Sequence, residues 1–106
     1  MKVLLDECVP QKLCTSFLEH ECSPARRAGF GGKGNGELLT LAEAAGFHVL
    51  ITVDGNIPYQ QKVTGRHIAL IVIAVRSNRL RDVLPYVPSC LNVLSSIKPG
   101  EVIRVG

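Results

Sequence analysis

The feature that most constrains the fold is a short aliphatic run that ends in acid, and the chain contains two of them. One is Leu4-Leu5-Asp6-Glu7 and the other is Ile51-Thr52-Val53-Asp54. Continuous Val, Ile and Leu runs are typical of buried parallel strands, and ligands of such sheets bind beyond the carboxyl ends of the strands. If the two strands are neighbours, Asp6, Glu7 and Asp54 share one edge of the sheet. Carboxylates held together repel one another, and a proton or a metal ion relieves the repulsion.

The rest of the chain alternates between strand and helix patterns. We expect helices at 11–19, 37–45 and 59–63, one kinked or two short helices between 77 and 97, and strands at 2–6, 21–25, 48–53, 67–75 and 101–105. This alternation predicts an α/β fold, with a doubly wound, mainly parallel sheet of five strands, helices on both faces and right-handed crossovers. The direction of the last strand stays open. With 106 residues, the chain is expected to form one domain, residues 1–106.

Composition narrows the class of protein further. The net charge of +3 permits an anionic partner without requiring one. No apolar run approaches the ~20 residues that a membrane-spanning helix needs. The first residues turn acidic at Asp6, too early for a signal peptide, so we expect a cytoplasmic protein. The four cysteines lack zinc-type spacing, and we interpret them as reduced packing residues rather than a site.

Further oxygen ligands are expected near the acidic strand ends. Glu37 opens the helix after a glycine-rich loop, and Asn56 follows Asp54 in the next turn. Together with Asp6, Glu7 and Asp54 they form an oxygen-rich set of the kind that binds Mg²⁺ or Mn²⁺. Such ions activate water and stabilise the reacting oxygens in phosphodiester hydrolysis. Each residue also has a structural interpretation, because Asp54 suits a turn, Glu37 a helix start and Glu7 a solvated surface.

Basic residues are expected at the same edge of the sheet. Arg26, Arg27 and Lys33 follow the second strand, and Arg76 and Arg79 follow the fourth. Arginine grips phosphate through a planar fork of donors, so these residues could bind a nucleic-acid backbone without reading its bases. The alternative for each of them is ordinary solvated charge.

Several motifs taken together resemble a family of small bacterial PIN-like domains. The matching stretches are Leu4-Leu5-Asp6-Glu7, Asn35-Gly36-Glu37-Leu38-Leu39, residues 50–61 from Leu50 to Gln61, Arg76-Ser77-Asn78 and Pro99-Gly100-Glu101-Val102. The resemblance covers nearly the whole chain. It implies a PIN-like sheet and a metal-dependent endoribonuclease, in a family often placed with the toxins of toxin–antitoxin pairs.

The resemblance also assigns roles to residues. It implies that Asp6, Glu37 and Asp54 are the catalytic acids and that Glu7 is the paired acid, with Mg²⁺ or Mn²⁺ as cofactor. Asn56 stands where a full PIN site can supply another carboxylate. The implied partners are an RNA substrate, an antitoxin protein and a second copy of the chain. The alternative is a catalytically inactive PIN-like module that binds nucleic acid or a protein partner.

Two other functions match parts of the sequence. Residues 29–34 read G-x-G-x-x-G, a dinucleotide-binding pattern, but three residues separate it from its strand and too little chain follows for a second nucleotide-binding half. Acids after the first and third strands also fit a phosphoacceptor receiver domain. That site needs a lysine after the last strand, where the chain has only Arg104 and Gly106. The histidines His20, His48 and His67 are expected at the opposite edge, as structural residues.

Overall fold

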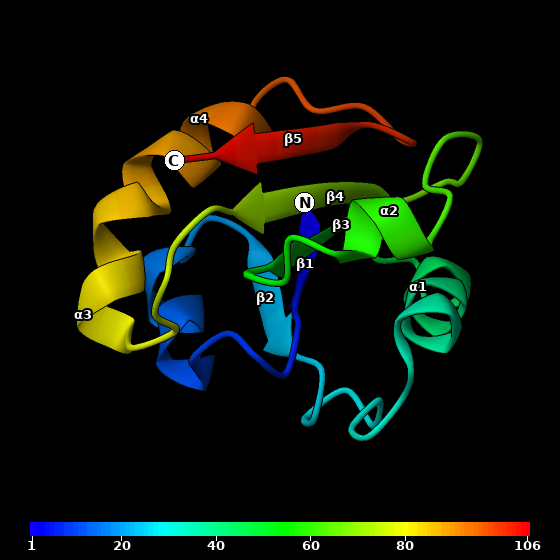
Figure 1. Ribbon diagram of the computed structural model, residues 1–106, viewed down its shortest axis with the longest axis horizontal. Coiled ribbons are helices and arrows are strands. Elements are labelled where there is room, and N and C mark those ends of the chain that lie inside the picture. The colour runs from blue at the N-terminus through cyan, green and yellow to red at the C-terminus, as the bar shows by residue number, and fades with distance from the viewer.

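All five predicted strands are present in the computed structural model, which describes residues 1–106, and they form one sheet in the order β2-β1-β3-β4-β5 (Figure 1). Every neighbouring pair is parallel, and this settles the direction of the last strand. Each strand is one to four residues shorter than predicted. Their bounds are β1 (Lys2–Leu5), β2 (Glu21–Pro24), β3 (Val49–Thr52), β4 (Ala69–Ile73) and β5 (Val102–Val105).

The connecting segments are helical, but most of them are short. Their bounds are η1 (Gln11–Ser16), α1 (Asn35–Ala44), α2 (Ile57–Gln60), α3 (Leu80–Val83), η2 (Leu84–Tyr86) and α4 (Val87–Leu94). The first, η1, is a 3-10 helix, shorter than the helix predicted for 11–19. The Thr15 hydroxyl donates to the Lys12 carbonyl at 2.7 Å, a local bond that competes with α-helical pairing. Pro85 and Pro88 lie in the first turns of η2 and α4, where proline is tolerated.

The sheet has helices on both faces, as predicted for a doubly wound fold. Alternate strand residues point to opposite sides: Val3, Leu5 and Ile51 pack beneath η1 and α4, while Leu4 and Leu50 pack beneath α1 and α2. Figure 1 shows α1 and α2 together on one side of the strands, with α3 and α4 together on the other. None of the helices has the length and apolar character required to cross a membrane.

One crossover has an unexpected hand. The connection from β1 to β2 runs toward one edge of the sheet, and the connection from β4 to β5 runs toward the other. Both connections nevertheless pack their helices, η1 and α4, on the same face. Parallel crossovers that move in opposite directions over one face have opposite hands, so the prediction that all crossovers are right-handed is wrong. The β4–β5 connection takes this hand because Val87, Cys90 and Leu94 of α4 pack into the cluster that η1 also covers.

Glu43 of α1 makes the fold sensitive to acid. Its carboxylate accepts the His67 backbone N–H at 2.6 Å and the Arg66 guanidinium at 3.2 Å. The hydrogen bond from His67, followed by the bonds and charge of Arg66, lowers the pKa of Glu43. A carboxyl with a lowered pKa stabilises the fold above its unfolded-state pKa, and that stability is lost as pH falls through the folded-state value.

We therefore expect Glu43→Gln to be less stable than the wild type at pH 7, with a difference that shrinks as pH falls through the acidic range. Urea unfolding at a series of pH values measures it. Glu19→Gln is the matched control, because Glu19 is exposed and makes no hydrogen bond or ion pair. A difference that stayed constant with pH would contradict the assignment.

Candidate functional site

The two acidic strand ends meet at the point where the strand order reverses. β1 and β3 are neighbours in the sheet, with Leu5 opposite Ile51, and the Asp6 N–H donates to the Ile51 carbonyl at 2.9 Å. From this pair, β2 lies toward one edge, and β4 and β5 lie toward the other. In open parallel sheets, ligands bind beyond the carboxyl ends of the strands at this switch point. Asp6 and Asp54 therefore follow the two strands that border the expected crevice.

Thr52 joins these two acids. It is the one polar residue among the buried residues, and its side chain is completely inaccessible. Its hydroxyl donates to Asp6 Oδ2 at 2.8 Å and accepts the Asp54 backbone N–H at 3.0 Å. A buried hydroxyl with both functions satisfied holds its partners in fixed positions. The only sequence signal for this role is a threonine at the end of an otherwise aliphatic strand.

The Asp6 carboxylate receives two further donors from its own loop. Oδ1 accepts the Glu7 backbone N–H at 2.8 Å, and Oδ2 lies 3.4 Å from the Cys8 thiol. Burial is the largest cause that raises the pKa of Cys8, and the charge of Asp6 adds to it. Cys8 therefore stays protonated at neutral pH and acts as a donor to Asp6. Asp6 is half-buried, so its carboxylate combines fixed orientation with access to solvent.

Glu7 anchors the glycine-rich loop. Its Oε1 accepts the Gly32 backbone N–H at 2.6 Å, and its Oε2 lies 3.6 Å from the Arg26 guanidinium. Asp6 and Glu7 both line a cavity of about 240 Å³ at the carboxyl ends of β1 and β2. The other residues that line the cavity are Val9 and Gln11, which follow β1, and Pro24, Ala25 and Arg26 at the end of β2.

The other residues predicted to bind a metal ion contact residues that are close to them in the sequence. Asp54 Oδ1 accepts the Asn56 backbone N–H at 2.9 Å, which closes the turn before α2. Glu37 pairs with Lys33, four positions earlier, at 3.4 Å. Nowhere in the chain do three or more His, Cys, Asp or Glu side chains form a group that could hold a metal ion. The structure thus connects Asp6 through Thr52 to the start of the Asp54 turn, while Glu37 contacts Lys33 and Asn56 contacts Asp54.

The predicted basic residues are all exposed and fall into three groups. Arg26 and Lys33 contact the acids Glu7 and Glu37, while Arg27 and Arg79 form no ion pair. Arg76 lines a hollow of about 300 Å³ beside the Asp54 turn, and Arg104 of β5 lines it too. Arg104 was not predicted as a phosphate-binding residue, because a residue near the end of the chain carries no signal that its strand lies next to β4.

The two other functions suggested by the sequence gain no support. β2 ends at Pro24, well before the G-x-G-x-x-G segment at 29–34, and the Gly32 N–H that could bind phosphate is occupied by Glu7. The strand order is that of receiver domains, but β5 contains no lysine that could reach the acids. Of the three functions considered, only metal binding at the acidic strand ends keeps its structural support.

Comparison with protein-family models, with curated proteins and with solved structures finds no match for this chain.

Proposed function

We propose that the chain is a PIN-like, metal-dependent endoribonuclease, with Mg²⁺ or Mn²⁺ bound at Asp6. The observation that carries the proposal is the geometry of Asp6 at the switch point. Its carboxylate is fixed by the buried Thr52 hydroxyl, the same hydroxyl holds the backbone of Asp54, and a cavity of about 240 Å³ lies beside it. The resemblance to PIN-like domains supports the same residues, with Glu7, Glu37 and Asn56 as further contributors and a toxin–antitoxin context for the activity.

The residues at this site fit a metal ion that is held by a few carboxylates together with water, but they do not form a complete cage of protein ligands. Mg²⁺ is commonly held by one or two carboxylates, several waters and the phosphates of the substrate. Asp6, with Glu7 or Asp54, offers such a partial set of oxygen ligands beside open space. A cage made only of protein ligands does not fit, because no group of three acidic, His or Cys side chains converges. When bound, the ion would lower the pKa of a water molecule and neutralise charge on the phosphate.

Side chains of the protein orient the Asp6 carboxylate and bind the phosphates of the substrate. Thr52 and Cys8 orient the Asp6 carboxylate by donating to one of its oxygens. Arg76 and Arg104 line the hollow beside the Asp54 turn, where guanidinium groups can hold the phosphates that flank the cleaved bond. These contacts reach only the backbone of the nucleic acid, so we expect little base specificity from them and a strong dependence of binding on salt.

A specific observation favours the second candidate, a module that binds nucleic acid or a protein partner without cleaving. All four proposed acids already have partners within the chain: Asp6 with Thr52 and Cys8, Glu7 with Gly32 and Arg26, Glu37 with Lys33, and Asp54 with its own turn. A metal ion would have to share these carboxylates with their present donors or displace the donors.

Calorimetric titration with Mn²⁺ separates the two candidates. We expect saturable binding by the wild type and its loss in Asp54→Asn, which keeps the side-chain oxygen that closes the turn but removes the charge. Thermal melting of both proteins without metal shows whether the variant is folded. No binding at millimolar Mn²⁺, together with a higher melting temperature for Asp54→Asn because repulsion is relieved, would contradict the nuclease and favour the binding module.

A further inference from the structure

Two of the four cysteines face each other between η1 and β2. Cys14 lies in η1 and Cys22 lies in β2, eight positions apart in the sequence, and their sulfur atoms are 2.7 Å apart. The chain reverses between them through a tight turn, in which the His20 N–H donates to the Phe17 carbonyl at 2.9 Å. Sequence spacing gave no sign of this pair, because the contact depends on how the 3-10 helix packs against the edge strand.

The other two cysteines provide an internal comparison. Cys90 is buried in the core, no other sulfur contacts it, and burial raises its pKa to about 11. The Cys8 thiol lies within hydrogen-bond distance of oxygen atoms of Asp6 and Thr52 rather than of another sulfur. Cys14 and Cys22 are both half-buried, so small reagents can reach them, and each has the other as its side-chain partner. A disulfide has a sulfur–sulfur length of about 2.05 Å, so the pair needs a shift of only about 0.7 Å to close.

We propose that Cys14 and Cys22 are a redox-active dithiol that a low-molecular-weight disulfide converts to an intramolecular disulfide. One thiol, as the thiolate, attacks a sulfur of the small disulfide, which forms a mixed disulfide and releases one small thiol. The second cysteine loses its proton and attacks the mixed disulfide at the protein sulfur, which releases the other small thiol. The protein loses two electrons and two protons, and the small disulfide gains them.

The contact between the two sulfur atoms supports this order of steps. Burial raises the pKa of Cys22, and the neighbouring Cys14 thiol raises it further, so Cys22 stays protonated at neutral pH and is assigned to the second attack. Two thiols this close do not ionise together, because the first negative charge opposes the second. One thiolate with an adjacent thiol is the arrangement that captures a mixed disulfide and resolves it within the protein, before a second small molecule reacts.

The disulfide would join two walls of the cavity beside Asp6. Gln11, at the start of η1, and Pro24, at the end of β2, both line that cavity. A bond between the two elements fixes one wall relative to the other. The inference does not depend on the proposed nuclease activity, because its chemistry involves only the two sulfur atoms.

Thiol trapping in glutathione buffers tests the proposal. The chain is equilibrated at a series of ratios of oxidised to reduced glutathione, alkylated with N-ethylmaleimide and digested with trypsin. The segment 13–26 contains both cysteines and no internal lysine or arginine, so it is released as one peptide. We expect this peptide to lose both maleimide adducts in a single two-electron transition, to reach a mass two hydrogens below that of the unmodified dithiol peptide, and to stay linked after cleavage at Glu19. We also expect the oxidised chain to melt roughly 5–10 °C higher and dithiothreitol to reverse the shift.

Two variants complete the test. Cys8→Ser keeps the pair and should form the same linked peptide, whereas Cys14→Ser should form none and should melt at the same temperature in both buffers. Stable glutathione adducts in place of the internal bond, a link that involves Cys8, or full alkylation of all thiols in oxidised glutathione would overturn the proposal. If Cys14→Ser does not fold, the peptide map of the wild type decides the question alone.

Discussion

Replacing Asp6 with asparagine is expected to lower the rate of Mg²⁺-dependent RNA cleavage by ~100-fold or more, the scale at which removal of one transition-state contact acts. The substitution keeps the shape of the side chain but removes its charge and one of its two acceptor oxygens. Three donors converge on this carboxylate, from Thr52, Cys8 and the Glu7 backbone, so no other acid can take its position. Loss of an acceptor in a half-buried network should also cost about 1–3 kcal/mol of stability.

Thr52 offers a way to separate the position of the carboxylate from its charge. Thr52→Val has nearly the same shape but no hydroxyl, so it leaves Asp6 with one donor fewer and the buried Asp54 N–H without an acceptor. Loss of such an orienting partner typically lowers metal affinity about 10–100-fold. Thr52→Ser restores the hydroxyl, and we expect it to recover most of the affinity. A merely structural role would lower the melting temperature of the valine variant without changing Mn²⁺ binding.

The measurement for Asp6 is the initial rate of cleavage of a labelled single-stranded RNA at saturating Mg²⁺, with circular dichroism to show that each variant is folded. Glu19→Gln serves again as the control for loss of a negative charge, because Glu19 is exposed and forms no hydrogen bond or ion pair. Equal rates for Asp6→Asn and the wild type would exclude Asp6 from the reaction. Absence of cleavage by the wild type in both Mg²⁺ and Mn²⁺ would favour the binding module.

The sequence predicted that the two acidic strand ends lie together, but it did not predict their contacts. Leu4-Leu5-Asp6 and Ile51-Thr52-Val53-Asp54 each show a buried strand that ends in acid, and parallel pairing necessarily brings such ends to one edge. A pattern within one segment cannot specify which side-chain oxygen meets which donor. Glu7 is bonded to Gly32, twenty-five positions away, and Thr52 is bonded to Asp6, forty-six positions away. Both contacts arise only when separate strands and loops are assembled.

The contact between Cys14 and Cys22 and the hand of the β4–β5 crossover also depend on how separate elements pack, so the sequence pattern did not predict them. Cys14 and Cys22 meet because η1 is a short 3-10 helix followed by a tight turn, whereas the pattern of residues 11–19 favoured a longer helix. The hand of the β4–β5 connection depends on which face α4 covers. That face is determined by Val87, Cys90 and Leu94 packing with the core beneath η1, and not by any signal at the strand ends.

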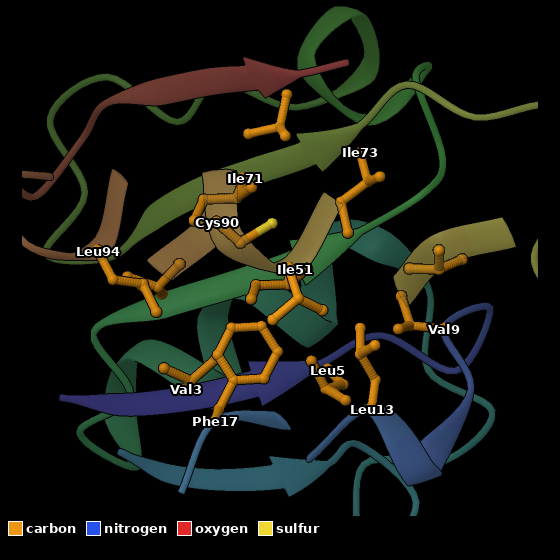
Figure 2. Close-up of a cluster of buried hydrophobic side chains, with 14 of the residues drawn as sticks. Val3, Leu5, Val9, Leu13, Phe17, Ile51, Ile71, Ile73, Cys90 and Leu94 are labelled. Atoms are coloured by element: carbon orange, nitrogen blue, oxygen red, sulfur yellow. The ribbon is translucent and has the colours of Figure 1, made fainter. Parts of the chain in front are cut away.

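Phe17 is the residue on which the packing of η1 depends most. Its side chain is fully buried and lies among Val3, Leu5 and Leu13 on the face of the sheet that η1 and α4 cover (Figure 2). The aromatic ring is the largest of the fully buried side chains, and truncation to alanine would leave a cavity that a sheet of short strands cannot close by small shifts. Substitutions of this type cost about 3–5 kcal/mol.

We expect Phe17→Ala to lower the free energy of unfolding by about 3–5 kcal/mol. This is a large share of the ~5–15 kcal/mol that stabilises a typical domain. Urea unfolding gives the free energy, and its midpoint should fall without a change in slope if the variant still unfolds in two states. The matched control is Leu18→Ala, one residue further on, where the side chain is 86% exposed and the expected change is within about 0.5 kcal/mol. Equal losses at the two positions would mean that η1 does not pack on the sheet as described. The wall of the Asp6 cavity and the contact between Cys14 and Cys22 both require that packing, so both would then have to be abandoned.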